Sequence, residues 1–556
     1  MSMTPPGPPL EPPPPPPGQG LPPLPSAQPP RQPRAPRNAA IIGVLVGVLV
    51  FAVAAAGFAS WKLVDNSDPD KGATTAPTPF VTPTPTASLP STPASLDRFY
   101  DQKLTWRQCG RDFCTHLEVP LDYADPSGRT LQLAVLKVPA QSKSKRIGAL
   151  VVNPGGPGGS GVTYAASGSL QFGGVLSDHF DIVGFDPRGV GLSDPLECLD
   201  TQGLDKVLAY DPDPDTSAEV AGMDRLMTEF GQSCLDKSGD LAKHMSTKEA
   251  AKDMDVLRAA LGEAKLDYLG ASYGTFLGAT YAEEFPKNVG RFVLDGAVDP
   301  ALSNTELSKQ QGQGFETALR AYLKDCIGGG DCFLGRTVDA AAARIKQFLA
   351  DTDAHPLGTG SSRQLTEGLA LTGIFLPLYV KSYWPQLTSA LKAAIEDHNG
   401  KELLSLSDAY ASRGSNGYTD NSMDVLYAVN CLDHDDYVQT KDVAKLIPSF
   451  EKAAPTFGRA FAYSTTSCSK WPVQSGERTA AIHAKGAPTI VVVGTTRDPA
   501  TPLSWAQALS KELDKGTLIT RDGDGHTGFQ QGNSCVDDAV EGWLVSGTKP
   551  EPDLHC

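Results

Sequence analysis

The sequence predicts an α/β fold, in which helices cover both faces of a mostly parallel β-sheet. Short apolar runs alternate with helical patterns from about residue 115 onward, which is typical of α/β sheets rather than all-β sandwiches. Two glycine-rich turns, residues 153–161 and 270–274, each follow directly on such a run. The 556 residues contain enough chain for a large core, although the first hundred do not have a globular composition.

Two segments near the N-terminus have compositions that cannot form a core. Residues 1–38 are dominated by proline, so we expect a disordered cytoplasmic tail, with a P-x-x-P docking ligand as the alternative. Residues 62–97 mix threonine, proline, serine and alanine and predict a semi-rigid linker. The folded part of the chain is therefore expected to begin near residue 98.

Residues 39–61 predict a single transmembrane helix. No charged side chain interrupts them, and their length is about that needed to cross a hydrocarbon core. Three arginines closely precede the segment and Asp65 follows it, so the positive-inside rule keeps the N-terminus in the cytoplasm. We therefore expect a single-pass protein of the cell membrane whose larger part is extracytoplasmic. The alternative is a secreted protein, released by signal-peptide cleavage near residue 55.

Seven apolar runs are predicted to be strands, and a helix with clear end signals leads into the fourth. Ser246 and Glu249 form a capping box at the start of this helix, and Gly262 ends it. The predicted strands are residues 131–138, 149–152, 181–185, 266–269, 291–294, 489–493 and 517–520.

Residues 270–274 read Gly-Ala-Ser-Tyr-Gly, a G-x-S-x-G that lies between the apolar run 266–269 and a helix-like segment. A nucleophile elbow requires this context, because its serine occupies a strained strand-to-helix turn beside which other chain segments pass closely. Ser272 is therefore the candidate nucleophile of an α/β-hydrolase. Since a lone G-x-S-x-G also arises by chance, the prediction depends on partners elsewhere in the chain.

The glycine-rich run 153–161 predicts part of an oxyanion hole. It follows a buried strand directly, and its glycines expose backbone N–H groups at the edge of the sheet. In an α/β-hydrolase one donor is the N–H after the nucleophile, here that of Tyr273, and the second comes from such a loop, here Gly155 or Gly156. A phosphate-binding loop is the alternative, but the run contains no G-K-[ST].

Asp498 and His526 are the predicted acid and base. Asp498 lies in the loop after the late run 489–493, and His526 lies in a glycine-flanked loop after the last predicted strand. This order of serine, acid and histidine is that of α/β-hydrolases. Asp295, which ends an earlier strand, is the competing acid. In such a site the histidine takes the proton of the nucleophile, while the acid orients the imidazole ring.

Residues 300–470 leave the strand pattern for helical stretches, such as 365–379 and 387–397. We interpret this stretch as a helical cap inserted into a hydrolase core, which then consists of residues 98–299 and 471–556. A cap over the catalytic edge of the sheet shapes the substrate cavity and excludes water. Specificity is expected to lie there.

All ten cysteines lie beyond the linker, and their even number is typical of disulfides in an oxidising exterior. The chain has no C-x-x-C pair and no zinc-finger spacing, so we predict neither a metal nor a cofactor. Sequence leaves the connectivity open, although pairing neighbours keeps every loop local. The neighbour pairs are Cys109 with Cys114, Cys198 with Cys234, Cys326 with Cys332, Cys431 with Cys468 and Cys535 with Cys556.

Together the motifs resemble the tripeptidyl aminopeptidase branch of the prolyl-aminopeptidase-like serine peptidases, with its tripeptidyl-aminopeptidase-like C-terminal region. The resemblance covers about residues 98–556 and implies that Ser272, Asp498 and His526 are the nucleophile, acid and base. These roles agree with those assigned from the residues. The matching pieces are residues 153–161, 270–275, 295–300, 498–502 and 525–527, with the closing Cys535 and Cys556.

The predicted function is a serine aminopeptidase that releases short peptides, tripeptides by the resemblance, from free N-termini. The net charge of −16 argues against nucleic acid as a partner, because a phosphate-binding surface needs concentrated lysine and arginine. A peptide is therefore the expected substrate. A carboxylesterase or lipid-ester hydrolase with the same triad is the alternative, and an inactive binding protein is the third hypothesis.

Asp433, Asp435 and Asp436 are the candidate contacts for the free amine of the substrate. An exopeptidase must neutralise an ammonium group at a fixed distance from its nucleophile, and carboxylates in a cap provide that charge. The segment lies within the predicted cap and is anchored by Cys431 if neighbouring cysteines pair. A solvated acidic loop is the alternative interpretation.

Overall fold

The computed structural model describes residues 94–473 and 480–556. The predicted tail and transmembrane helix, residues 1–38 and 39–61, lie outside the described residues, as does the linker except for its last four positions. Within the described ranges, no helix combines the length and apolar character that a membrane span needs.

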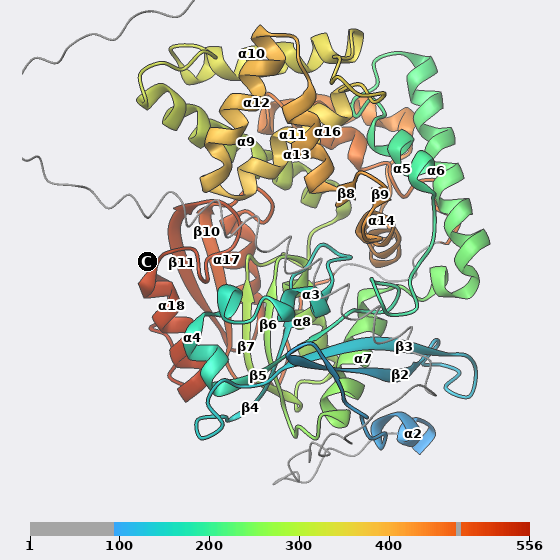
Figure 1. The fold of residues 1–556 in the computed structure, drawn as a ribbon, viewed down its shortest axis with the longest axis vertical. Helices are drawn as coiled ribbons and strands as arrows, with labels where there is room; N and C mark the ends of the chain where they lie inside the picture. Colours follow the sequence, from blue (N-terminus) through green and yellow to red (C-terminus); the bar gives the residue numbers. More distant parts are fainter. Residues whose placement is uncertain (1–93, 474–479) are drawn as a thin grey trace, which may run out of the picture. The chain divides into compact units, whose positions relative to one another are not determined.

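Ten strands of the described chain form one sheet, in the order β1-β2-β3-β5-β4-β6-β7-β10-β11-β12 (Figure 1). Neighbouring strands from β5 to β12 run parallel, whereas β1, β2 and β3 add antiparallel pairs at one edge. The strands are β1 (Arg107–Cys109), β2 (Asp112–Pro120), β3 (Thr130–Val138), β4 (Gly148–Asn153), β5 (Phe180–Phe185), β6 (Leu266–Ala271), β7 (Val289–Asp295), β10 (Ile490–Arg497), β11 (Gly516–Asp524) and β12 (Leu554–His555).

All seven predicted strands are confirmed, with ends that differ by a few residues. Three further strands, β1, β2 and β12, were not predicted from the sequence. The first and last of these contain only three and two residues, too few for a periodic pattern. In β2 the exposed His116 and partly exposed Glu118 interrupt the apolar positions, because this strand lies near the sheet edge.

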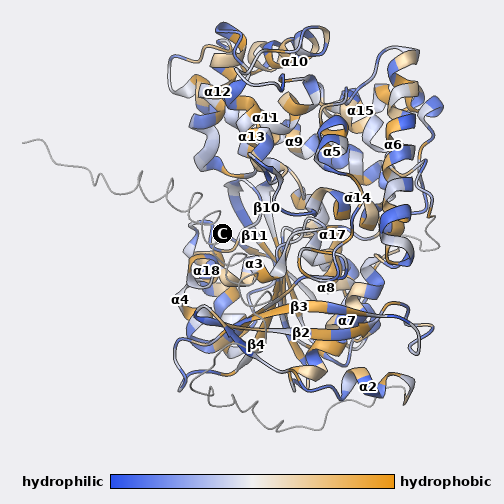
Figure 2. Ribbon diagram, turned by 45° about the vertical axis from the view of Figure 1, so that its right-hand side comes forward, coloured by the Kyte–Doolittle hydropathy of each residue, from blue (hydrophilic) through white to orange (hydrophobic). Residues whose placement is uncertain are grey.

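Alternate side chains along the central strands enter two separate apolar cores. In β4, Val151 packs on one face of the sheet, while Leu150 and Val152 pack on the other. In β6, Tyr268 and Leu269 divide in the same way. Parallel strands that are buried on both faces have continuous apolar sequences, which explains why the runs predict them. Figure 2 shows the hydrophobic colour along β3 and through the middle of the sheet.

Helices cover both faces of this sheet. One face packs against α7 (Thr247–Ala260), α8 (Tyr273–Glu284) and α17 (Leu503–Glu512). The other packs against α3 (Gly161–Ala166), α4 (Ser169–His179) and α18 (Ser534–Glu541). The predicted start of α7 is confirmed, since the Ser246 hydroxyl oxygen accepts the Glu249 N–H at 3.4 Å.

Residues 304–464, which we call the helical region, contain eight α-helices. Seven of these helices share an apolar core of their own, whereas the buried residues of α14 belong to one of the two cores of the sheet. The predicted helical stretches 365–379 and 387–397 correspond to α11 and α12. The helices are α9 (Asn304–Gly328), α10 (Val338–Ala354), α11 (Glu367–Tyr379), α12 (Trp384–Glu396), α13 (Lys401–Tyr410), α14 (Ser422–Asp433), α15 (Ile447–Ala453) and α16 (Gly458–Ser464), with a two-stranded pair of β8 (Arg413–Gly414) and β9 (Gly417–Tyr418).

Two helices from an earlier part of the chain pack beside the helical region. These are α5 (Thr201–Leu208) and α6 (Ser217–Ser238), which connect β5 to the segment before α7. Leu208, Val220 and Met223 of this connection contact the apolar core of the helical region. These helices were not predicted from the sequence, because no motif lies in them.

All ten cysteines form disulfides, as their even number predicts, and the connectivity that the sequence leaves open is that of the five neighbour pairs. The Cys431–Cys468 bond joins the end of α14 to the segment after α16. The Cys535–Cys556 bond fastens the last residue to α18. The latter bond closes a local loop and thereby holds β12 against the sheet edge.

Candidate active site

Ser272 occupies the turn between β6 and α8. Its φ of +58° and ψ of −127° lie in a region that residues other than glycine rarely adopt. The turn is held because the Ser272 N–H donates to the Asp295 carbonyl at 2.9 Å. A Cβ on Gly274 would lie 2.8 Å from Asn153 Oδ1, so the end of β4 can approach only a glycine. The backbone therefore has the geometry of a nucleophile elbow.

Asp498 and His526 face each other across the loops that follow β10 and β11. Both carboxylate oxygens of Asp498 lie 2.9 Å from Nδ1 of His526. The same carboxylate accepts the backbone N–H groups of Ala500, Thr501 and Thr527 at 2.9–3.0 Å. Because Asp498 is only 2% exposed, these bonds hold its carboxylate in one orientation toward the imidazole.

The remaining ring nitrogen of His526 is available for proton transfer. Nε2 is buried and has no hydrogen-bond partner among the described residues. Burial lowers the pKa of His526, but the charge and hydrogen bond of Asp498, with the charge of Asp295, outweigh it and raise the pKa above the ordinary value. With Nδ1–H directed at Asp498, Nε2 presents the lone pair that a general base uses.

Tyr379, the last residue of α11, covers this histidine from the helical region. Its ring lies edge-on to the imidazole with the ring centres 5.4 Å apart. The Tyr379 backbone carbonyl also accepts the backbone N–H of His526 at 2.8 Å. Burial raises the pKa of the Tyr379 hydroxyl well above its ordinary value, so this side chain stays neutral. Tyr379 was not among the site residues predicted from the sequence.

The competing acid, Asp295, holds the loop that follows the histidine. Its two carboxylate oxygens accept the backbone N–H groups of Gly528 and Phe529 at 2.8 and 2.9 Å. Burial raises the pKa of Asp295 to about 6, although these two hydrogen bonds act in the opposite direction. The structure therefore brings Asp498, and not the Asp295 carboxylate, into hydrogen bonding with His526.

Gly296 lies between the elbow and the histidine. It follows Asp295, whose carbonyl binds the Ser272 N–H, and a Cβ on Gly296 would lie 3.2 Å from Cε1 of His526. Ser272 and His526 therefore lie beside the same short stretch of backbone. The three residues predicted to form the triad thus gather at one end of the parallel strands, as the order of an α/β-hydrolase requires.

The glycine-rich loop after β4 touches the elbow. A Cβ on Gly155, whose φ is +92°, would lie 2.8 Å from both Ser272 Cβ and the Tyr273 nitrogen, so only glycine fits there. The Gly155 N–H donates to Asn153 Oδ1 at 2.9 Å, whereas the Gly156 N–H has no acceptor among the described residues. Of the two predicted loop donors, Gly156 is the one available to an oxyanion.

The three predicted amine contacts lie in different environments. Asp433 is buried, and its oxygens accept the N–H and hydroxyl of Thr247 at 2.8 and 2.6 Å. The Thr247 hydroxyl is also hydrogen-bonded to the Tyr273 hydroxyl, which links Asp433 to the residue after Ser272. Asp436 is partly exposed and accepts a backbone N–H from the start of α9 at 3.2 Å, and Asp435 is exposed.

This combination defines a serine hydrolase of the α/β-hydrolase class, because it joins a strained serine after a parallel strand, an aspartate–histidine pair on later loops and a glycine-rich loop beside the serine. A family model described as TAP-like protein matches residues 454–556. Serine protease Hip1 of Mycobacterium tuberculosis is 37% identical over 482 residues, which cover 82% of this chain and 91% of that protein.

Two further relatives cover similar parts of the chain. Carboxylesterase B of Mycobacterium tuberculosis is 34% identical over 452 residues, covering 80% of this chain and 86% of that protein. Tripeptidyl aminopeptidase of Streptomyces lividans is 32% identical over 470 residues, covering 82% of this chain and 86% of that protein. The chain therefore belongs to the TAP-like family of α/β-hydrolases, and the predicted resemblance to tripeptidyl aminopeptidases is confirmed.

Proposed function

We propose that this serine hydrolase is a membrane-anchored, extracytoplasmic aminopeptidase that releases short peptides from free N-termini. The observation that carries the proposal is the Asp498–His526 pair, which presents a free Nε2 at the strand end where Ser272 lies. The relatives named serine protease and tripeptidyl aminopeptidase support a peptide substrate. The anchor rests on the sequence of residues 39–61 alone, and sequencing the mature N-terminus tests it.

The proposed reaction passes through an acyl-enzyme. The Ser272 hydroxyl oxygen attacks the scissile carbonyl while His526 Nε2 takes its proton. The N–H groups of Tyr273 and Gly156 stabilise the negative oxygen of the tetrahedral intermediate. His526 then gives the proton to the leaving amine. In the second half of the reaction His526 takes a proton from water, the water oxygen attacks the acyl-enzyme, and the proton passes to the Ser272 oxygen as the N-terminal peptide is released. Asp498 keeps the imidazole in the required tautomer and stabilises its charged form.

Asp433, Asp435 and Asp436 are proposed to face the ammonium group of the substrate. The link from Asp433 through Thr247 to Tyr273 supports this placement, because it joins the acidic segment to the nucleophile turn. Asp435 and Asp436 keep part of their carboxylates exposed and can accept a further donor. A negative charge at this position would hold the substrate N-terminus at a fixed distance from Ser272 and so set the length of the peptide that is released.

Acetylating the N-terminus of a peptide substrate is expected to lower kcat/KM by at least about tenfold, which corresponds to about 1.4 kcal/mol from one charge-assisted contact. The measurement compares matched free and acetylated peptides. The variant Asp436→Asn should reduce the ratio of kcat/KM between the free and the acetylated peptide. The variant Asp397→Asn, which removes an exposed carboxylate elsewhere, should leave this ratio unchanged. Equal cleavage of free and acetylated peptides would contradict the aminopeptidase proposal.

The pH profile of kcat/KM should show an acid limb that belongs to His526. Because the pKa of His526 is raised above its ordinary value, about 6.5, the imidazole becomes protonated and inactive as pH falls through that raised pKa. Activity is therefore expected to be full above the limb and lost below it, with a midpoint above about 6.5. In Asp498→Asn the midpoint should move to lower pH. A midpoint that stays unchanged in this variant would contradict the assigned pair.

A carboxylesterase is the second candidate function, because one relative of 34% identity is named carboxylesterase B. The same nucleophile, base and oxyanion donors would serve an ester, which has a better leaving group than an amide. Assaying the purified protein on a peptide library and an ester panel separates the two functions. Hydrolysis of esters with no turnover of any free peptide would favour the esterase.

A further inference from the structure

A cavity of about 210 Å³ lies between five helices, α5, α6, α11, α14 and α16. Most of the side chains that line it are apolar, among them Leu208, Met223, Leu226 and Phe375. The first three of these remain partly exposed, although side chains of their kind are usually buried. Apolar side chains that are exposed inside a hollow are typical of a site that a ligand covers. We call this space the apolar cavity.

One wall of the apolar cavity leads to His526. Gly368 and Phe375 of α11 line the cavity, and Tyr379 follows on the same face of this helix. Because an α-helix rises 1.5 Å per residue, Phe375 lies about 6 Å from Tyr379 along the axis, and Gly368 about 16 Å. Phe375 and Tyr379 also pack against the ring of Phe315, with ring centres 4.2 and 5.6 Å away. Since Tyr379 contacts His526, the cavity begins about one helical turn from that contact.

A second wall leads to the glycine-rich loop after β4. Tyr427 of α14 lines the apolar cavity, and the first turn of the same helix lies on that loop. A Cβ on Gly158 would lie 2.6 Å from the Ser422 carbonyl oxygen and 3.1 Å from Cβ of Val425. The apolar cavity therefore shares one helix with each side of the candidate active site, α11 with the histidine and α14 with the glycine-rich loop.

The segment after α16 joins the apolar cavity to one of the proposed amine contacts. Thr466 and Ser467 line the cavity, and the carbonyl of the preceding Thr465 accepts a hydrogen bond from Asn304 Nδ2 at 3.3 Å. The backbone N–H of Asn304 donates to Asp436 at 3.2 Å. A peptide whose ammonium group lies at Asp436 can therefore direct the side chain of its first residue into the cavity.

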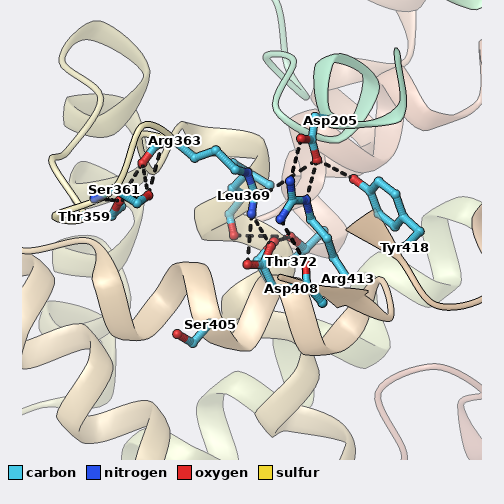
Figure 3. A network of polar contacts seen from close by, with 12 residues as sticks. Asp205, Thr359, Ser361, Arg363, Leu369, Thr372, Ser405, Asp408, Arg413 and Tyr418 are labelled. Atoms are coloured by element: carbon cyan, nitrogen blue, oxygen red, sulfur yellow. Dashed lines mark hydrogen bonds and ion pairs between the residues drawn. The ribbon is translucent and has the colours of Figure 1, made fainter. Parts of the chain in front are cut away.

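A polar network holds the walls formed by α5 and α11 in place (Figure 3). Asp205 of α5 accepts two hydrogen bonds from Arg413 of β8, at 2.7 and 2.9 Å. Thr372 of α11 lines the apolar cavity, and its hydroxyl is hydrogen-bonded to that of Ser407 in α13 at 2.7 Å. Since β8 follows closely on α13, both walls are fastened to the same part of the helical region. The cavity is therefore formed before a ligand enters it, as most ligand sites are.

We propose that the apolar cavity binds the side chain of the first residue of the peptide substrate and selects large apolar side chains there. This inference rests on the proposed aminopeptidase function. An extended tripeptide spans about 10 Å, so a peptide whose third carbonyl lies at Ser272 places its first residue within the distances that the cavity covers along α11. A cavity of about 150 Å³ holds a benzene molecule, so about 210 Å³ accommodates the side chain of phenylalanine or leucine.

The hydrophobic effect provides the selectivity. When a phenylalanine or leucine side chain enters the apolar cavity, its surface and that of the exposed apolar walls both leave water. A glycine at the first position leaves the walls exposed. The contact is made in the bound peptide and in the transition state alike, so the preference is expected both in kcat/KM and in the affinity for a peptide that is not cleaved.

Three peptides that differ only in their first residue, phenylalanine, leucine or glycine, test the proposal on the full-length chain. We expect kcat/KM to be at least about tenfold higher for the first two than for the glycine peptide. Ala460→Phe, which places a ring in the apolar cavity from α16, should reduce this ratio to about twofold or less. Met223→Trp, which fills the cavity from α6, should do the same. Ala393→Phe, at a partly exposed position of α12 outside the cavity, should keep the full ratio.

Titration calorimetry on Ser272→Ala tests the apolar cavity without catalysis. The tripeptide Phe-Ala-Ala should bind at least about tenfold more tightly than Gly-Ala-Ala, and adding Ala460→Phe should remove the difference, with melting temperatures checking that each variant folds. Release of peptides at equal kcat/KM for all three first residues, or equal binding of the two tripeptides, would overturn the cavity proposal and leave the aminopeptidase proposal standing. No release from any peptide, with the tenfold difference in affinity retained, would contradict the aminopeptidase proposal and support the cavity as a site for an apolar first residue.

Discussion

Ser272→Ala is expected to lower kcat for every substrate by roughly 10⁴–10⁶ and to abolish labelling by a fluorophosphonate probe. The change removes the attacking hydroxyl and nothing else. Alanine keeps the Cβ, so the strained backbone of the turn between β6 and α8 has the same conformational free energy in the variant. The melting temperature should therefore stay within about one degree. Gel fluorescence after probe labelling and single-turnover kinetics measure the two effects.

Ser177→Ala is the matched control for this experiment. Ser177 is buried, whereas Ser272 is partly exposed; Ser177 lies in α4, and its hydroxyl has no hydrogen-bond partner in the described part of the chain. This variant should keep full labelling and turnover. Labelling that persisted in Ser272→Ala would assign the nucleophile to another residue and remove the basis of the proposed mechanism.

Asp498→Asn is expected to lower kcat by about 10⁴, because an amide in place of the carboxylate favours the wrong imidazole tautomer. Asp295→Asn should cost much less in kcat, since the Asp295 carboxylate binds the backbone of Gly528 and Phe529. Its main effect should be a lower melting temperature, because an amide nitrogen would face one of those N–H donors.

Measuring kcat and melting temperature for both variants separates catalysis from loop stability. A larger loss of kcat in Asp295→Asn than in Asp498→Asn would reassign the acid. It would also mean that the 2.9 Å contacts between Asp498 and His526 are not the contacts that orient the imidazole for catalysis.

Local patterns explain how much of the fold is predictable from the sequence. The parallel strands are buried on both faces, so each appears as an apolar run, and Ser246 with Glu249 marks the start of α7. The strained turn at Ser272 and the pairing of Asp498 with His526 are predictable because their motifs lie at strand ends, where this fold places its site. The even number of cysteines predicts disulfides, but their connectivity became clear only from the fold, in which each bond joins neighbouring cysteines.

Contacts between distant segments were not predictable. Tyr379 reaches His526 from a helix almost 150 residues earlier, and no motif surrounds it. The choice between Gly155 and Gly156 depends on which N–H is already bonded to Asn153, which sequence does not reveal.

Product analysis by mass spectrometry tests the central claim most directly. The purified full-length chain would be incubated with an unblocked peptide of about ten residues, and with the same peptide acetylated at its N-terminus. The proposal predicts early release of short N-terminal peptides, tripeptides by likeness to the relative of that name, from the unblocked peptide alone, and none with Ser272→Ala. Cleavage within both peptides, or ester hydrolysis with no peptide release, would contradict it.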